Sequence, residues 1–289
     1  MLDIGVFAPF GADHERNRAF CRDTAVRHIV LSVSDASGGE GPPAAADLAR
    51  LAGEYAAEGV TLAALTPPRV PQQAFADAGT RERELESIGR LLESMGTAGV
   101  PYVHFYLNVD PLSDDGERAA LWQGLVEYYR GLAERAEAAG VKISTHHYHV
   151  PDRLLWNYES MTRLLDEAPS ANSGVTFCQG KSLMAGDDLV ANILDYGDRI
   201  FMFHARDVET EPAGPVPAEL RERFERLGYL EVAFGTGEVD MAGCFRALKR
   251  IGYKGQVYPE HYPSIAGDSA AGLAWTVGYM RALDQVIEV

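Results

Sequence analysis

Four apolar segments rich in β-branched and aromatic residues each end in a side chain that can bind a metal ion. In chain order these segments, each with its last residue, are VKISTH (His146), GVTFC (Cys178), IFMFH (His204) and QVYPE (Glu260). Imidazole, thiolate and carboxylate groups brought to one place make a site for a divalent transition metal. If the four segments are neighbouring parallel strands, their ends converge and the sequence predicts a metal centre.

Each of these residues also has an ordinary structural interpretation. A buried cysteine such as Cys178 usually packs as a small hydrophobic residue. The stretch THHYH could be a solvated loop, and Glu260 with His261 could form a surface turn before Pro263. Four consecutive segments that all end in a metal-binding residue are hard to produce by chance, so the pattern favours the metal centre.

The elements that must position these residues alternate between strands and helices. The segments with strand character are residues 4–10, 28–34, 60–65, 102–107, 141–146, 174–178, 200–204 and 256–260. Helices are predicted at residues 14–24, 44–59, 81–96 and 117–139, the last of them ending at Gly140. Eight strands, each followed by helix-length sequence in a chain of 289 residues, predict a single (β/α)8 TIM barrel over residues 1–289. A doubly wound open sheet is disfavoured because GVFAPFGADH carries no glycine-rich phosphate loop after the first strand.

Active sites of such barrels lie at the C-terminal ends of the strands, which is where the four candidate ligands fall. The long interval between His204 and Glu260 requires one long connection, which residues 207–240 supply with the stretches EPAGPVPAEL, ELRERFERL and FGTGEVD. We interpret this connection as a lid over the barrel mouth. His104, in the middle of YVHFYL, should be a core or barrel-lining residue, and His147 should point away from whatever His146 faces because neighbouring strand residues alternate.

Composition limits the class of protein and its partners. The net charge of −16 disfavours nucleic acid and anionic membranes, which require a basic face. No run of about 18 apolar residues and no secretory leader is present, so we expect a cytoplasmic protein. The three widely spaced cysteines argue against a disulfide framework.

Two stretches carry a resemblance to known families. The segment GTGEVDMAGCFRALKRIGYKGQVYPEH resembles the end of a xylose-isomerase-like TIM barrel, from the sugar isomerase/epimerase superfamily. The segment GVTFCQGKSLMAGDDLVANILDYGDRIFMFHARDV is similar, more narrowly, to the mannonate dehydratase family, with its Gly-x-Thr-x-Cys-x-Gly, Asp-Leu, Gly-Asp-Arg-Ile and His-x-Arg motifs. The superfamily resemblance covers nearly the whole chain, and the family-specific part is strongest from about Val141 onward.

The resemblance implies roles for particular residues. The metal ligands would be the same four strand-end residues, and the catalytic histidine would be His261. Arg206, in the His-x-Arg motif, would contact a substrate carboxylate through its planar fork. Lys181, three residues after Cys178, and Asn108, after the fourth strand, are further candidates for substrate binding.

The expected cofactor is a divalent cation. The resemblance implies Mn²⁺, which we place first. A thiolate ligand by softness suits Zn²⁺, Fe²⁺ or Co²⁺ better, and Mg²⁺ remains an alternative. The ion would act as a Lewis acid in the dehydration of a sugar acid such as D-mannonate to a 2-keto-3-deoxy acid.

The chain departs from the mannonate dehydratase pattern at two places. Glu260 stands where that family has Asp, and the stretch GDSAAGLAW stands where that family has its catalytic tyrosine. Expulsion of a hydroxyl group needs a proton donor, so another side chain must supply it. We predict Tyr148 or Tyr262 for this role, because Tyr148 would share a strand face with His146 and Tyr262 follows His261.

Two other functions remain open at this point. A metal-dependent sugar isomerase or epimerase would resemble superfamily members that use carboxylates at the positions of His146 and Cys178, and this chain has a carboxylate ligand only at Glu260. A barrel that binds a sugar acid without catalysis is the other alternative. As partners we expect a small-molecule sugar acid or sugar and further copies of this chain in a homo-oligomer, with no nucleic acid and no membrane.

Overall fold

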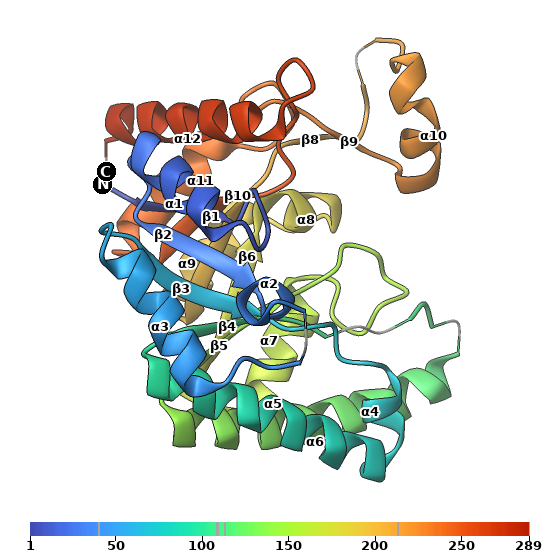
Figure 1. Cartoon of the computed structure of the whole chain (residues 1–289). Coiled ribbons are helices and arrows are strands. Elements are labelled where there is room, and N and C mark those ends of the chain that lie inside the picture. Colours follow the sequence, from blue (N-terminus) through green and yellow to red (C-terminus); the bar gives the residue numbers. More distant parts are fainter. Residues whose placement is uncertain (40, 108–109, 113, 213, 289) are drawn as a thin grey trace.

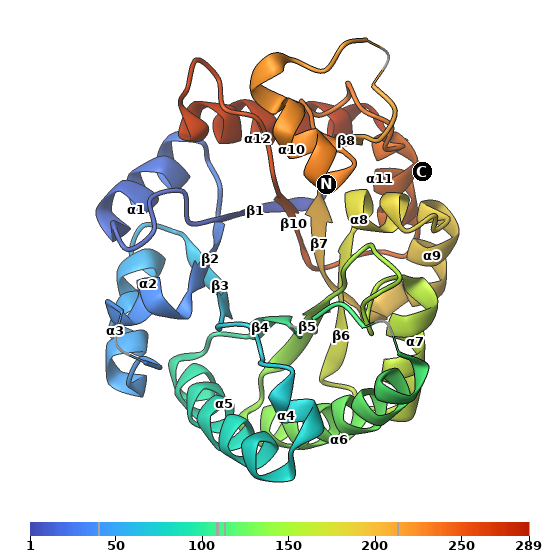
Figure 2. The same cartoon turned by 90° about the vertical axis from the view of Figure 1, so that its right-hand side faces the viewer.

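The protein is a closed barrel of parallel strands enclosed by helices. The computed structural model describes residues 1–39, 41–107, 110–112, 114–212 and 214–288. Around the barrel the strands follow the order β1-β10-β7-β6-β5-β4-β3-β2, and Figure 2 shows the ring of strands within the outer layer of helices. The predicted (β/α)8 barrel is therefore confirmed. Its strands are β1 (Asp3–Phe7), β2 (His28–Ser32), β3 (Thr61–Thr66), β4 (Tyr102–Tyr106), β5 (Lys142–His146), β6 (Ser173–Cys178), β7 (Ile200–Ala205) and β10 (Gln256–Pro259).

The helices form the outer layer and several short excursions at the barrel mouth. They are α1 (His14–Asp23), α2 (Val33–Ser37), α3 (Ala45–Ala56), α4 (Gln73–Ala76), α5 (Ala78–Ala98), α6 (Asp115–Ala139), α7 (Tyr158–Glu167), α8 (Gln179–Met184), α9 (Leu189–Tyr196), the 3₁₀ turn η1 (Gly197–Arg199), α10 (Ala218–Leu227), α11 (Met241–Arg250) and α12 (Ser269–Val286). Within the described part of the chain, no helix is both long and apolar enough to cross a membrane.

Two of the strands that carry the candidate ligands, β6 and β7, are buried on both faces. Every residue of β6 and of β7 is buried, because one face meets the barrel interior and the other meets the helices. Strands of parallel sheets covered on both faces have this near-continuous apolar composition. This burial makes the strand ends rigid supports for polar side chains.

Two strands end two or three residues earlier than their composition predicts. β1 stops at Phe7, because the following residues turn and the Asn17 side chain accepts a hydrogen bond from the Phe10 amide at 3.1 Å. β2 stops at Ser32, whose hydroxyl oxygen accepts a hydrogen bond from the Asp35 amide at 3.0 Å and so caps α2. Both corrections have the same cause, since side chains that bond to nearby backbone compete with the strand ladder.

The helices predicted from apolar periodicity are confirmed. α5 buries the five predicted core residues, Leu85, Ile88, Leu91, Leu92 and Met95. α6 ends at Gly140, which has the left-handed φ of 68° that commonly terminates a helix. Periodicity located these elements because one helical face had to pack against the barrel.

The long connection after β7 forms an excursion that projects from the rim of the barrel mouth (Figure 1). It contains the short antiparallel pair β8 (Val208–Glu209) and β9 (Leu230–Glu231), and the charged stretch ELRERFERL lies within α10. At the base of the excursion, the buried carboxylate of Asp207 accepts hydrogen bonds from four backbone amides. These are the amides of Val208 (3.0 Å), Gly235 (2.8 Å), Gly237 (3.0 Å) and Val239 (3.2 Å). The excursion is thus anchored at its base, and its action as a lid stays a prediction.

We expect Asp207→Ala to lower the free energy of unfolding by about 3 kcal/mol. Hydrogen bonds to a charged group contribute about 1.5–3 kcal/mol each, their losses are not additive, and four amides would lose their acceptor together. Urea unfolding followed by circular dichroism measures the change. The exposed Asp23 is the matched control, since Asp23→Ala should change stability by no more than about 0.5 kcal/mol. Equal stability of the two variants would contradict the anchoring role.

Candidate metal centre

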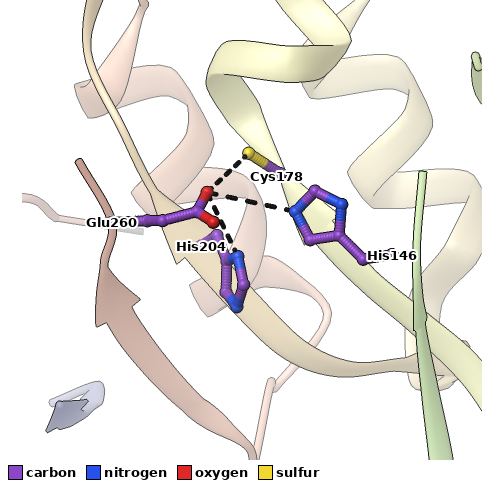
Figure 3. A group of neighbouring side chains, drawn as sticks. All are labelled: His146, Cys178, His204 and Glu260. Atoms are coloured by element: carbon purple, nitrogen blue, oxygen red, sulfur yellow. Dashed lines mark hydrogen bonds and ion pairs between the residues drawn. The ribbon is translucent and has the colours of Figure 1, made fainter. Parts of the chain in front are cut away.

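The four predicted ligands lie together at the C-terminal mouth of the barrel (Figure 3). Their strands β5, β6, β7 and β10 are consecutive neighbours in the barrel. Cys178 is paired in register with His204, and the amide of Glu260 donates to the carbonyl of Ala205 at 2.8 Å, so β10 delivers its ligand to the same level. The convergence predicted from the strand ends is what the fold produces.

The ligand atoms surround one point. The Oε2 atom of Glu260 lies 3.3 Å from Nδ1 of His204, 3.4 Å from Sγ of Cys178 and 3.9 Å from Nε2 of His146. All four ligand atoms are within 4.8 Å of one another. Tetrahedral ligands at about 2.0–2.3 Å from a metal ion are separated by roughly 3.3–3.8 Å, so a small contraction would bring all four atoms within bonding distance of one ion.

The hydrogen bonding of the imidazoles also fits a cation. His146, Cys178 and His204 are almost fully buried. Nε2 of His146 and Nδ1 of His204 have no hydrogen-bond partner among the described residues, although unpaired buried nitrogens are costly. Nδ1 of His146 donates to the His147 carbonyl at 2.6 Å, which leaves the Nε2 lone pair directed at the other ligands. The group therefore has the donors, burial and orientation of a site for a divalent ion.

Burial also sets the protonation of the ligands. It lowers the pKa of His146 well below the usual value, so this imidazole is neutral. Burial, together with the charge of Glu260, raises the pKa of the Cys178 thiol to about 12. A bound cation would displace the thiol proton, as coordination requires a thiolate. The identity of the cation stays a prediction, with Mn²⁺ first.

His261 lies beside this group and faces the opening. Its Nε2 is 3.6 Å from Oε1 of Glu260, and its Nδ1 is 3.9 Å from Oε1 of Glu231. The His261 side chain is 46% exposed. Its backbone has a left-handed φ of 55°, a strained conformation for a non-glycine residue that is often found at functional sites. His261 is thus the more exposed neighbour of a largely buried ligand group.

The guanidinium of Arg206 is already engaged by Glu231. Nε donates to Glu231 Oε2 at 3.0 Å, and Nη2 donates both to Glu231 Oε1 and to the Tyr229 hydroxyl at 3.0 Å. Gly180 leaves room for the Arg206 stem, because a Cβ there would lie 3.0 Å from Cγ and Cδ of Arg206. Only Nη1 remains, buried without a hydrogen-bond partner in the described residues and 4.0 Å from Oε2 of Glu260. Of the Arg206 guanidinium, which was predicted to bind a substrate carboxylate, only Nη1 is therefore still left free by the described residues to donate a hydrogen bond.

The remaining predicted residues are distributed around the mouth. Lys181 lies on α8 with Nζ 5.5 Å from the ring centroid of Tyr148, and burial lowers the Lys181 pKa. Tyr262 lines a cavity of about 610 Å³ that opens beside Glu260. Asn108 lies outside the described residues.

His147 does not join the group of ligands that His146 faces, which agrees with the expectation. The two rings are stacked with centroids 5.8 Å apart, and Nε2 of His147 lies 3.2 Å from the Ser182 hydroxyl oxygen. β5 ends at His146, so His147 is the first residue after the strand. The interpretation of His104 as a barrel-lining residue is confirmed, since it is fully buried with Nδ1 3.2 Å from the Thr66 hydroxyl.

Two residues of the site had not been expected. The Tyr106 hydroxyl donates to Oε1 of Glu260 at 3.1 Å, and Glu231 contacts both Arg206 and His261. Tyr106 is the last residue of β4, so the rule used for the other strand ends could have identified it. Glu231 gave no such signal, because its contacts depend on how the excursion folds back over the barrel.

The fold agrees with a comparison of the sequence with known families. The family model described as "Xylose isomerase-like TIM barrel" matches residues 20–283. The chain therefore belongs to the xylose isomerase-like TIM barrel family.

Part of the chain is similar in sequence to curated mannonate dehydratases. It is 31% identical over 131 residues to the mannonate dehydratase of Saccharophagus degradans, a match that covers 43% of this chain and 30% of that protein. It is 28% identical over 156 residues to the mannonate dehydratase of Oceanobacillus iheyensis, with 52% and 42% covered. The matched segments thus span less than half the length of these relatives.

Solved structures match over nearly the whole barrel. The mannonate dehydratase of Streptococcus suis aligns with a TM-score of 0.75 and 20% identity, covering 98% of this chain and 93% of the other. An L-ribulose 3-epimerase aligns with the same TM-score of 0.75 and 18% identity, covering 99% and 96%. At these identities the structural matches establish the fold, and they match a dehydratase and an epimerase equally well.

Proposed function

We propose that this protein is a metal-dependent sugar-acid dehydratase that converts an aldonic acid such as D-mannonate to its 2-keto-3-deoxy acid. The observation that carries the proposal is the buried group of two histidines, one cysteine and one glutamate with His261 beside it at the opening. The names of the curated sequence relatives support the same chemistry.

Dehydration requires a base for the proton next to the carboxylate and an acid for the leaving hydroxyl. A divalent cation held by the four ligands would supply Lewis acidity for the charge that develops on the substrate carboxylate. Burial lowers the pKa of His261 against the opposing charge of Glu260, so the imidazole is neutral near pH 7 and can accept the proton. Nη1 of Arg206 and the ammonium of Lys181 offer positive charge for holding a substrate carboxylate.

The proton for the leaving hydroxyl has a further candidate besides Tyr148 and Tyr262. Tyr106 hydrogen-bonds to the candidate ligand Glu260 and lines the same cavity as His261. Burial and the charge of Glu260 raise the pKa of Tyr106 well above its usual value, so this hydroxyl is protonated at neutral pH. These contacts make Tyr106 our preferred donor, with Tyr148 and Tyr262 retained as alternatives.

We expect Tyr106→Phe to lower kcat by about 10²- to 10⁴-fold, the usual contribution of a general acid, while metal content is unchanged. The Tyr148→Phe, Tyr262→Phe double variant tests the two alternatives in the same assay, with kcat and metal content measured for each. A large loss only in the double variant would assign the proton to that pair. Full activity in all of these variants would exclude the three hydroxyls and require another proton donor.

The test of the proposed function is a panel of sugar acids incubated with the metal-loaded protein. Formation of a 2-keto-3-deoxy acid from one of them, measured by a colorimetric assay for such products, identifies both reaction and substrate. No product from any acid, with full metal content, would contradict dehydration.

Epimerisation of a free sugar is the second candidate. The structural match to L-ribulose 3-epimerase is as good as that to a mannonate dehydratase, so we retain epimerisation as an alternative. Among the four candidate ligands, however, only Glu260 is a carboxylate, so a two-carboxylate proton relay cannot be built from them. Interconversion of ketoses by the same metal-loaded protein, without dehydration, would favour this alternative. A barrel that binds sugar acids without turnover, and assembly into a homo-oligomer, also stay predictions.

A further inference from the structure

The cavity beside Glu260 extends beyond the candidate metal centre toward β1, β2 and β3. On that side it is lined by Ser32, Asp35, Thr66 and Arg69, none of which belongs to the ligand group or to its immediate contacts. A volume of about 610 Å³ falls within the range of roughly 300–1,000 Å³ typical of small-molecule sites. The space therefore exceeds what one carboxylate and its neighbouring hydroxyl require.

Arg69 is the one guanidinium or ammonium group among the described residues that line this cavity. Its guanidinium carbon lies 5.5 Å from the ring centroid of Tyr106, whose hydroxyl reaches Glu260 at 3.1 Å. A single aromatic side chain thus separates the cation from the candidate metal centre. Arg69 has no ion pair with any residue that the structure describes, so its fork is available for an anion.

Polar groups between the two ends fit the hydroxyls of a sugar chain. Nε2 of His104 is fully buried, lines the cavity and has no hydrogen-bond partner in the described part of the chain. Asp35 and Ser32 share a hydrogen bond of 2.6 Å at the cavity edge, and the carboxylate keeps further acceptor capacity. Phe7 and Val30 supply an apolar wall. A polyhydroxylated chain would satisfy this lining, whereas a short acid would leave it unused.

The negative charge around the cavity makes a cation at Arg69 necessary for binding an anion there. The chain carries a net charge of −16, and both Asp35 and Glu260 line the cavity, so an anion at its far end would be repelled without a local cation. Arg69 supplies that cation, and its planar fork matches carboxylate or phosphate oxygens.

We propose that Arg69 forms a second anion subsite, which binds an anionic group at the end of the sugar chain remote from the metal centre. The preferred substrates are then sugar acids that are anionic at both ends, either dicarboxylates or phosphorylated aldonic acids. This inference rests on the proposed function for the end of the substrate at the metal centre.

Calorimetric titration of the Mn²⁺-loaded protein tests the subsite by binding rather than by turnover. The probes are a hexonate, the corresponding hexarate and the hexonate 6-phosphate. We expect at least a 10-fold lower Kd for a doubly anionic acid than for the hexonate. Comparison of the hexarate with the hexonate 6-phosphate shows whether the subsite binds a carboxylate or a phosphate. In Arg69→Gln this preference should fall below 2-fold. Arg163, stacked 4.1 Å from the Trp122 ring centroid and outside the cavity, is the matched control, and Arg163→Gln should keep the preference.

The outcomes separate the subsite from the reaction. Equal Kd values for all acids in the unaltered protein, or a preference retained in Arg69→Gln, would overturn the subsite even if dehydration is observed. A preference that disappears in Arg69→Gln would support the subsite even if no 2-keto-3-deoxy product forms, in which case the proposed reaction alone fails. Binding of none of the acids would overturn both.

Discussion

Cys178→Ala is expected to abolish retention of the divalent ion while the barrel stays folded. The thiolate supplies one of four candidate ligands, and its removal leaves a gap on one side of the ion. His204→Ala should have the same effect, because both nitrogens of His204 are buried with no other partner among the described residues. Elemental analysis after gel filtration measures metal per chain, and circular dichroism checks the fold.

Cys244→Ala is the matched control for this expectation. Cys244 is also a fully buried free thiol, but it lies on α11 in the outer layer, away from the barrel mouth. Loss of metal in Cys178→Ala together with full metal in Cys244→Ala would separate coordination from a general effect of removing a buried thiol. Full metal content in both Cys178→Ala and His204→Ala would rule out the site as described.

His261→Asn is expected to retain the ion and to lose turnover by about 10²- to 10⁴-fold, the range of a general acid or base. Retention follows because Glu260, not His261, lies in the four-residue group. The loss follows because the neutral imidazole at the opening is the proposed proton acceptor, and an asparagine amide cannot take up a proton. The measurements are kcat on the sugar acid that the panel identifies and metal content per chain.

A histidine at the other end of the barrel provides the comparison. His28 begins β2 near Asp3, so His28→Asn should leave both turnover and metal content unchanged. If His261→Asn instead lost its metal, Glu260 and His261 would have to exchange roles. If it kept both metal and turnover, the base would have to be sought elsewhere in the cavity.

The local pattern of apolar residues was sufficient to locate the strands of the barrel and its two longest helices. The apolar runs located all eight strands, and the periodic faces of α5 and α6 located their helices, because burial on a known side constrains residue type at each position. Boundaries failed where a side chain capped a turn, as Ser32 and Asn17 do. Those boundaries depend on individual hydrogen bonds, which the pattern of apolar residues does not predict.

The sequence by itself determined which residues stand at the strand ends, and hence the four candidate ligands and His261. Parallel strands closed into a barrel bring their C-terminal ends to one rim, so a local rule about strand ends becomes a statement about a site.

Only the tertiary structure decided which side chains surround the four candidate ligands and what they contact. Glu231 takes most of the Arg206 fork across 25 positions of chain, Tyr106 reaches Glu260 across 154, and Arg69 joins the same cavity from the loop after β3. These contacts form where the excursion and the loops fold over the mouth. Their geometry is set by long-range packing, on which neither periodicity nor residue spacing carries information.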